Sequence, residues 1–344
     1  MTVAAPAAET IGGKAVDPDA PLLSVRDLRV EFRASTGVVY AVNGLSYDLD
    51  AGETVAILGE SGSGKSVSAQ AVMGIVDTPP GFVTAGSVRF RGVNLFDLPE
   101  GERRKVRGNR IAMIFQDALT ALNPVYTVGW QIAEMYRVHR GTSRKAARRK
   151  AIELLDLVRV PSPAERVHAY PHEFSGGMRQ RVMIAMALAL DPDVLIADEP
   201  TTALDVTVQA QVMHLLADLQ AEYHMGLILI THDLAVVADV ADRLVVMYAG
   251  REVETAPVHD LFAQPWHPYT HGLMRSIPRA DQKGKRLDPI VGQPPDLAHL
   301  PSGCPFHPRC PMAREPDCIV HDPPLRELAP GRASACHFAE ELQR

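Results

Sequence analysis

The sequence lacks the features of three broad classes of protein. No run approaches the roughly eighteen apolar residues that a membrane-spanning helix needs, so we expect no such helix. Residues 1–20 are rich in Ala and Pro without a basic start or an apolar core, which argues against a secretion signal and predicts a disordered tail. The formal net charge of −6 argues against the broad basic surface that sequence-independent binding of nucleic acid requires. What remains is a chain of 344 residues, 46% of them hydrophobic, that can bury a globular core and has room for two domains.

The strongest motif is a complete G-x-x-x-x-G-K-S/T phosphate-binding loop at residues 59–66, between an apolar run at 55–58 and a helical pattern at 67–75. Its glycines allow a tight turn whose N–H groups face phosphate oxygens, and the following helix adds its positive N-terminal end. Lys65 would neutralise the β- and γ-phosphates, and Ser66 would ligate Mg²⁺. The alternative is a glycine-rich turn without a ligand. The residues expected to contact the nucleotide are Gly59, Ser61, Gly62, Ser63, Gly64, Lys65, Ser66 and Val67.

Further apolar runs indicate an α/β fold. Helical stretches separate runs at 111–115, 194–197, 227–230 and 244–248, which is the pattern of buried parallel strands. Segments 23–32 and 38–49 around a turn at 34–37 predict a β-hairpin. Phe32 is the first choice for an aromatic ring that stacks on adenine and Tyr40 the second, although ordinary strand packing explains either residue as well.

Polar side chains follow three of the apolar runs. Gln116 ends the first, Asp198 and Glu199 the second, and His232 lies just after the third. Ligands collect at the carboxyl ends of parallel strands, so we expect Asp198 to hold Mg²⁺ and Glu199 to polarise the water that attacks the γ-phosphate.

A second anion site is predicted at residues 174–181. Ser175 is placed to cap a helix that runs to Leu190, and Gly176 and Gly177 leave the N-terminal N–H groups of that helix bare. A routine N-cap with a flexible entry loop explains the same residues.

Composition divides the chain further. Residues 117–178 are rich in helix formers, with helices expected at 128–138 and 144–158, and form a candidate helical subdomain. Beyond Gly250 the sequence becomes rich in Pro and His, which predicts a loop-rich extension over 259–344 after a nucleotide-binding domain at 21–258.

Taken together, these motifs resemble the nucleotide-binding subunit of ABC transporters. Residues 59–66, Gln116, the LSGGQ-like segment 174–180, the Walker B run 194–199, residues 203–205 and His232 carry the resemblance over about 230 residues, from Leu23 to about Val253. It implies a P-loop α/β domain with a parallel core sheet, an antiparallel β subdomain and a helical subdomain.

In that family two such subunits pair head to tail around two ATP molecules. The resemblance therefore assigns Ser175, Gly176 and Gly177 to the γ-phosphate of the partner's ATP and Asp205 to a contact across the dimer. It makes Gln116 the sensor of Mg²⁺ and water, and His232 the switch at the γ-phosphate. In isolation, a strand-end solvent group and helix caps would explain Gln116, His232 and Asp205.

Two segments narrow the family. Residues 117–124 and 266–278 resemble the ATPases of oligopeptide and dipeptide importers, in particular their D-type subunits, and nickel importers share much of the pattern. The resemblance implies two membrane permeases, a second ATPase chain that is identical or a sister, an extracytoplasmic peptide-binding protein, and a peripheral position at the cytoplasmic face of the plasma membrane.

All four cysteines lie in the extension, with the spacing C-x5-C-x7-C-x17-C at Cys304, Cys310, Cys318 and Cys336. Four thiols in a short loop-rich segment argue for a metal centre over disulfides in a reducing compartment. The absence of C-x-x-C makes a zinc ribbon less natural, and four thiolates suit a 4Fe-4S iron–sulfur cluster, as the resemblance also implies. Zinc and no metal remain alternatives, and the nearby His307, His321 and His337 fit surface positions better than ligand positions.

Two rival classes of function remain. A soluble ABC-type ATPase that is not coupled to transport would normally carry two cassettes or a long coiled-coil insertion, and this chain has one phosphate loop and no heptads. A nucleotide-gated binder without productive hydrolysis would not need Glu199 and His232.

Overall fold

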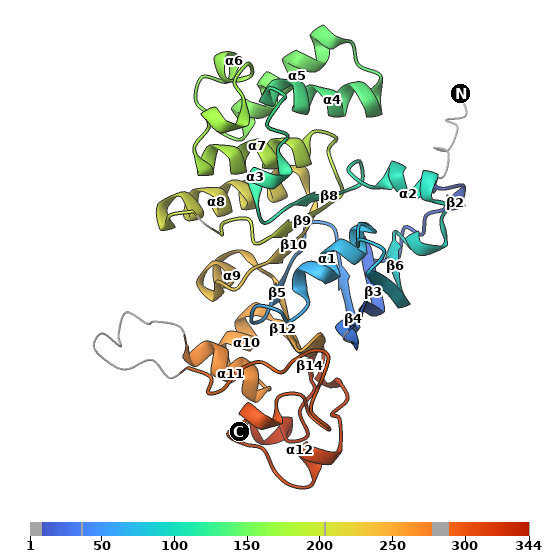
Figure 1. Ribbon diagram of the computed structural model, residues 1–344, viewed down its shortest axis with the longest axis vertical. Coiled ribbons are helices and arrows are strands. Elements are labelled where there is room, and N and C mark those ends of the chain that lie inside the picture. The colour runs from blue at the N-terminus through green and yellow to red at the C-terminus, as the bar shows by residue number, and fades with distance from the viewer. Residues whose placement is uncertain (1–8, 36, 203, 277–288, 344) are drawn as a thin grey trace, which may run out of the picture. The chain divides into compact units, whose positions relative to one another are not determined.

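The computed structural model describes residues 9–35, 37–202, 204–276 and 289–343 (Figure 1). The chain divides into two compact units. The first unit comprises Met1–Ser24, Asp48–Glu53 and Ser87–Ile228, and the second comprises Val25–Tyr47, Thr54–Gly86 and Leu229–Arg344. Four strands continue from one unit into the other: β3 (Leu23–Ala34), β4 (Gly37–Leu49), β6 (Gly81–Phe90) and β10 (Gly226–Ile230).

The first unit is mainly helical. Its helices are α2 (Glu100–Val106), α3 (Ala118–Ala121), α4 (Val128–Arg140), α5 (Arg144–Leu157), α6 (Pro163–Arg166), α7 (Gly176–Leu188) and α8 (Val206–Tyr223), with 3₁₀ turns η1 (Leu95–Asp97) and η2 (Pro171–Glu173). Its strands are β1 (Thr10–Ile11), β2 (Lys14–Ala15), β7 (Val93–Asn94), β8 (Ile111–Ile114) and β9 (Val194–Asp198).

Helices α4, α5 and α7 pack together within the first unit (green in Figure 1). Helix α4 begins where the Thr127 hydroxyl accepts a hydrogen bond from the Trp130 N–H, and it ends at Gly141, whose φ is 61°. It buries Val128 and Ile132, one turn apart on one face. The helices predicted at 128–138 and 144–158 are therefore present.

Strands β8 and β9 pair in parallel in the first unit, with Ile114 opposite Ala197. Both are buried along their length, as continuous apolar runs predict. Their carboxyl ends consequently lie side by side.

The second unit carries a mixed sheet in the order β13-β14-β12-β11-β5. Its strands are β5 (Thr54–Leu58), β11 (Arg243–Tyr248), β12 (Arg251–Pro257), β13 (Arg326–Ala329) and β14 (Arg332–Ser334). Its helices are α1 (Lys65–Met73), α9 (Leu234–Val240), α10 (Val258–Ala263), α11 (Pro268–Arg275) and α12 (Asp317–Val320), with 3₁₀ turns η4 (His307–Arg309) and η5 (Ala339–Glu341).

Strands β5 and β11 pair in parallel, as expected, whereas β12, β14 and β13 add antiparallel strands at one edge. The sequence patterns do not identify these three strands. The C-terminal segment thus extends the same sheet that carries the phosphate loop (orange to red in Figure 1).

A separate sheet has the order β4-β3-β6-β7. Strands β3 and β4 are neighbours in this sheet, as the predicted hairpin requires, and residue 36 of the predicted turn lies outside the described residues. Strand β6 ends at Phe90 because Gly92, with φ of 81°, opens a turn into β7.

Part of the N-terminal segment expected to be disordered is ordered. Residues 1–8 lie outside the described residues, but β1 and β2 pair in antiparallel fashion, with Thr10 opposite Ala15. Gly12 and Gly13, both at positive φ, form the turn between them. The Ala- and Pro-rich composition of the segment does not reveal this turn. No helix among the described residues is long and apolar enough to cross a membrane.

Candidate functional site

The phosphate loop lies in the second unit, between β5 and α1. Gly62 and Gly64 have φ of 78° and 100°, in the region that favours glycine. A Cβ at Gly64 would lie 2.1 Å from the Ala41 carbonyl oxygen, and one at Gly59 would lie 2.3 Å from that of Met247. The loop is therefore closely surrounded by backbone, and only glycine fits at these two positions.

Two polar side chains are buried inside this loop. The Lys65 ammonium donates hydrogen bonds to the carbonyl oxygens of Gly59 and Glu60 at 2.8 and 2.9 Å. The Ser63 hydroxyl is buried and has no hydrogen-bond partner among the described residues. A buried hydroxyl without a partner is costly, so we infer that this loop is preformed to bind a polar ligand. Its backbone N–H groups are donors that suit phosphate oxygens.

His232 lies in the same unit, at an adjacent strand end. The Thr231 N–H donates to the Ile57 carbonyl oxygen at 3.4 Å, which brings the end of β10 beside the strand that enters the phosphate loop. The Thr231 hydroxyl accepts from the Asp233 N–H at 3.0 Å, and Asp233 caps α9. The cap role that was an alternative for His232 thus belongs to Asp233, and the His232 side chain is exposed.

The two candidate adenine-stacking residues differ in their surroundings. Phe32 is half-buried, and a Cβ at Gly81 would lie 2.9 Å from its ring. Tyr40 is 47% exposed. The contact with Gly81 gives Phe32 a packing role in the strand, and the stacking role stays a prediction for both.

In the first unit, the ends of β8 and β9 bring together Gln116, Asp198 and Glu199. The Gln116 side-chain amide donates to the Glu199 carboxylate at 2.9 Å, and the Thr202 hydroxyl donates to the same oxygen at 2.9 Å. Asp198 is buried at the last position of β9, and Glu199 follows at φ of 45°. A non-glycine residue at positive φ is strained, and such strain concentrates at functional sites.

The predicted second anion site is also in the first unit. The Ser175 hydroxyl accepts a hydrogen bond from the Met178 N–H at 3.4 Å and caps α7, while Ser175 and Gly176 are exposed. Asp205 caps α8 by accepting from the Val208 N–H at 3.0 Å. A Cβ at Gly177 would lie 2.6 Å from the Val208 side chain, so the starts of α7 and α8 pack closely together.

The phosphate loop and His232 belong to one unit, and Gln116, Asp198, Glu199, Ser175–Gly177 and Asp205 belong to the other. Each unit thus assembles its own share of the predicted residues. Their joint use of one nucleotide remains a prediction.

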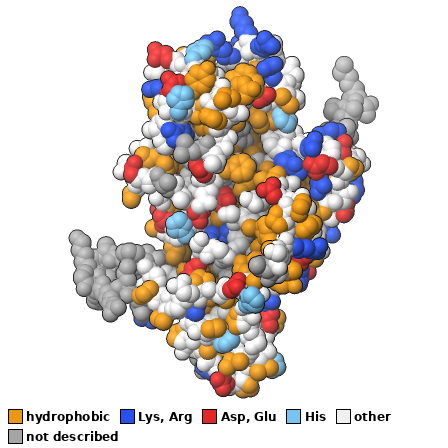
Figure 2. Space-filling model, in the orientation of Figure 1, with side chains coloured by type: hydrophobic (Ala, Val, Ile, Leu, Met, Phe, Trp, Pro, Cys, Tyr) orange, Lys and Arg blue, Asp and Glu red, His pale blue; other side chains and the backbone are white. Residues whose placement is uncertain are grey.

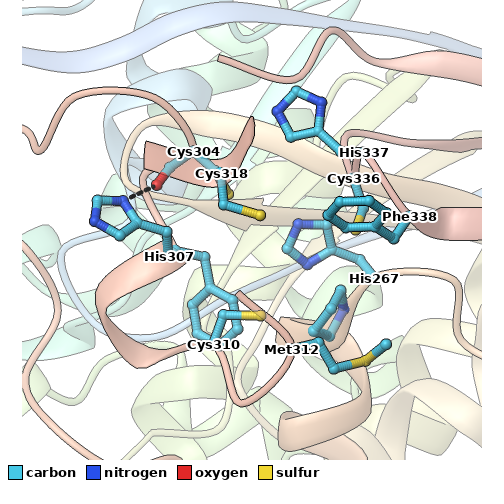
Figure 3. A pocket seen from close by; sticks show the side chains of 11 residues that line it. His267, Cys304, His307, Cys310, Met312, Cys318, Cys336, His337 and Phe338 are labelled. Atoms are coloured by element: carbon cyan, nitrogen blue, oxygen red, sulfur yellow. Dashed lines mark hydrogen bonds between the residues drawn. The ribbon is translucent and has the colours of Figure 1, made fainter. Parts of the chain in front are cut away.

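All four cysteines line one cavity in the C-terminal segment, together with His267, His307 and His337 (Figure 3). Its volume is about 20 Å³, close to the space of one or two waters. Among the described residues no group of three or more Cys, His, Asp or Glu is arranged to hold a metal ion. The four sulfur donors suit an iron–sulfur cluster chemically, but the cavity would have to widen to admit one.

Two of the three histidines that line this cavity form hydrogen bonds with backbone carbonyl groups. His307 Nδ1 is bonded to the Cys304 carbonyl oxygen at 2.9 Å (Figure 3), and His337 Nε2 to that of His321 at 2.9 Å. His267 is fully buried, and burial lowers its pKa to about 3. Burial also raises the pKa of the Cys304 thiol to about 12 and that of Cys336 to about 11, so both thiols carry protons at neutral pH unless a metal displaces them.

Comparison with known proteins decides the family. Residues 42–202 match the ABC transporter family, and residues 253–318 match the C-terminal region of oligopeptide/dipeptide transporters. The chain is 51% identical to the oligopeptide transport ATP-binding protein OppD of Salmonella typhimurium over 94% of this chain and 95% of that protein. It is 54% identical to the dipeptide transport ATP-binding protein DppD of Bacillus subtilis over 84% of this chain and 87% of that protein.

The chain belongs to the ABC transporter family. Within it, the chain is an ATPase subunit of the oligopeptide/dipeptide type, which confirms the resemblance drawn from the motifs. Among solved structures, the dimeric ATP-binding cassette MJ0796, in a post-hydrolysis state bound to ADP and Pi, aligns with a TM-score of 0.62 at 27% identity. The alignment covers 69% of this chain and 98% of that chain and confirms the predicted ABC-type α/β fold.

Sequence reasoning missed two groups that contact this family's motifs. Thr202 bonds to Glu199, and the signal that could have found it is its position three residues further along the loop that follows β9. Arg309 pairs with Glu60 of the phosphate loop, and no sequence pattern links residues 249 positions apart.

Proposed function

We propose that this ATPase subunit powers the uptake of short peptides through partner membrane proteins. The observation that carries the proposal is the Gln116–Glu199 hydrogen bond at the paired ends of β8 and β9, because it sets a carboxylate and a water-sensing amide together as hydrolysis requires. The peptide cargo rests on the relatives, whose names specify oligopeptide and dipeptide transport.

The chemistry follows from the two groups of residues. Lys65 would leave its bonds to the loop carbonyls and neutralise the β- and γ-phosphates, while the loop N–H groups cradle them. Ser66, Asp198 and Gln116 would hold Mg²⁺, which when bound would supply positive charge for the triphosphate. Glu199 would orient the attacking water and accept its proton, and His232 would hydrogen-bond the γ-phosphate.

A second ATPase chain, identical or a sister, would complete each site. The exposed Ser175 and the N–H groups of Gly176 and Gly177 would form an anion site, and the phosphate loop of this chain lies in the other unit. A head-to-tail pair would bring this site to the partner's γ-phosphate, with Asp205 at the contact. The dimeric state of MJ0796 supports this arrangement.

Exposed aromatic side chains in the first unit fit a membrane-protein partner. Tyr126 and Trp130 stack with ring centroids 4.1 Å apart and are 42% and 37% exposed. Phe115, directly before Gln116, is 40% exposed. Figure 2 shows hydrophobic side chains (orange) next to basic ones (blue) on the surface over the helices of the first unit. Exposed aromatic side chains of this kind, one of which directly precedes Gln116 in the sequence, would couple two permease subunits to the site. This would place the chain peripherally on the cytoplasmic face of the plasma membrane, with an extracytoplasmic peptide-binding protein joined through the permeases.

A 4Fe-4S cluster at Cys304, Cys310, Cys318 and Cys336 remains part of the proposal. The four thiols share one cavity and the neighbouring histidines are bonded to backbone groups, which favours an all-sulfur donor set over a zinc site with histidine. Protein purified without oxygen should contain about four iron and four sulfide per chain, and Cys318→Ser should lower both. Stoichiometric zinc, or no metal at all, would contradict this assignment.

The catalytic assignment predicts that Glu199→Gln keeps ATP binding and loses turnover. Removing a positioned general base costs roughly 100- to 10,000-fold in rate, whereas the phosphate loop is untouched. The measurement is steady-state ATPase activity of the complex assembled with its permeases, alongside ATP affinity of the purified chain. Near-normal turnover in the variant would remove Glu199 from the mechanism.

Cargo is tested separately. Nickel importers share much of the C-terminal pattern, so uptake of labelled di- and oligopeptides and of nickel is compared in cells with and without this chain. Loss of nickel uptake alone would replace the peptide proposal. ATPase activity without any permease partner would favour the soluble class.

A further inference from the structure

Two residues of the C-terminal segment (residues 259–344) form hydrogen bonds with Glu60, the second residue of the phosphate loop. The Arg309 guanidinium donates to the two carboxylate oxygens of Glu60 at 2.6 and 2.9 Å. The Tyr269 hydroxyl accepts a hydrogen bond from the Glu60 backbone N–H at 2.8 Å. The Arg309 side chain is 5% exposed and Tyr269 is fully buried, so water competes little with these bonds.

Arg309 is itself held by a residue of strand β11 and a residue of the C-terminal segment. Its guanidinium also donates to the Tyr248 hydroxyl at 3.3 Å and to the Val291 carbonyl oxygen at 3.2 Å. Phe306, which lines the four-cysteine cavity, packs against Tyr248 and Tyr269 with ring centroids 5.2 and 5.4 Å apart. Arg309 directly precedes Cys310, so a change in the backbone around the cavity would move the guanidinium.

Lys65 holds the same loop residue from the other side, because its ammonium donates to the Glu60 carbonyl oxygen. When Lys65 turns to a phosphate, this bond and the bond to Gly59 are lost. The contacts to Arg309 and Tyr269 then hold Glu60 together with the Ser63 N–H, which donates to the Glu60 carbonyl oxygen at 3.2 Å.

We propose that Arg309 and Tyr269 are positioning residues for nucleotide binding, which fix Glu60 and so make the shape of the phosphate loop depend on the fold of the four-cysteine segment. The inference rests on the proposed function in one respect, that this loop binds ATP. It requires no metal in the cavity.

The test measures Mg-ATP affinity of the full-length chain by calorimetry. Arg309→Ala should weaken binding about tenfold, because it removes a sheltered bidentate pair and leaves the Glu60 charge unpaired beside the phosphates. Tyr269→Phe removes one oxygen and should weaken binding about threefold, and Arg309→Lys should recover part of the loss. In the assembled complex, Arg309→Ala should raise KM for ATP with kcat nearly unchanged.

The matched control is Arg314→Ala. Arg314 pairs bidentately with Glu341 in the same segment and does not bond to the phosphate loop in the described residues, so its removal should leave ATP affinity within about twofold of wild type. The double variant Glu60→Gln, Arg309→Ala should bind Mg-ATP no more weakly than the weaker of the two single variants, because both substitutions remove the same Arg309–Glu60 pair.

Wild-type affinity in Arg309→Ala and Tyr269→Phe, with melting temperatures that show folded protein, would overturn the inference. Equal losses in Arg309→Ala and Arg314→Ala would also overturn it, since they would indicate a general effect of the segment. If Arg309→Ala does not fold, Arg309→Lys and Tyr269→Phe decide alone. Failure of the wild-type chain to bind Mg-ATP would instead refute the proposed function.

Discussion

Two glycine-rich helix starts of this chain offer N–H groups to anions, and they are built in opposite ways. The start of α1 follows Gly64, has no side-chain cap, and lies against the backbone at Ala41. The start of α7 is capped by Ser175, and both Ser175 and Gly176 are exposed.

The difference indicates which site works alone. A start enclosed by its own unit, with Lys65 and Ser63 buried in it, can hold a phosphate from within one chain. An exposed start whose cap uses only the Met178 N–H presents its remaining donors outward, to a ligand carried by another molecule. If both starts bind phosphate as proposed, one chain contains one complete phosphate site and one half-site.

The largest expected effect is on the free energy of unfolding, because the two helix starts differ in how closely they are packed. Gly64→Ala places a Cβ 2.1 Å from the Ala41 carbonyl oxygen at φ of 100°, and should lower the free energy of unfolding by about 4 kcal/mol or more. Gly176→Ala meets its nearest atom, on Leu204, at 3.7 Å and should change it by less than about 1 kcal/mol. Urea unfolding of both variants checks this; similar losses would remove the contrast between enclosed and open starts.

The second unit, which contains the start of α1, carries a buried carboxyl group that should make the free energy of unfolding depend on pH. Burial raises the pKa of Glu252 on β12 to about 7, from 4.5. Its stabilising protonated form is fully present below pH 4.5 and is lost as the pH rises through 7, so stability falls over that window. Glu252→Gln mimics the protonated form and should match wild type at pH 5 but exceed it by about 3 kcal/mol at pH 8.

The measurement is denaturant unfolding of wild type and Glu252→Gln at both pH values. Glu327→Gln, which alters an exposed carboxylate on β13, is the control and should show no such difference between the two pH values. Equal stability of Glu252→Gln and wild type at pH 8 would contradict the prediction.

The smallest effect tests the half-site directly. Lys65→Ala should weaken Mg-ATP binding to the single chain about 10- to 100-fold, because a charge-assisted contact to phosphate is lost. Ser175→Ala should leave that affinity unchanged and lower ATPase activity only in the paired complex. Calorimetry on the single chain and an ATPase assay on the complex distinguish the two, and weakened binding in the single-chain Ser175 variant would show that both starts serve the same molecule.

The sequence predicts those parts of the fold and site that are encoded in short contiguous runs. The loop at 59–66 and the strands before Gln116 and Glu199 are local patterns, and their pairing follows because parallel strands end at one edge. The contact of Arg309 with Glu60 and the pairing of Glu254 with Ser334 join residues far apart, and no periodicity encodes such contacts. Thr202 lies close to Glu199 in sequence, but only the strained turn at Glu199 brings its hydroxyl to the carboxylate.

The pairing of β14 with β12 has a practical consequence for shortened forms of the chain. β14 hydrogen-bonds β12 at Glu254 and Thr255, and β13 covers β14 in turn. A version cut after residue 318, where the family match ends, would uncover the backbone amides and carbonyls along β12. Unpaired strand edges form hydrogen bonds with strands of other molecules, so such a fragment should aggregate during purification even though its phosphate loop is intact.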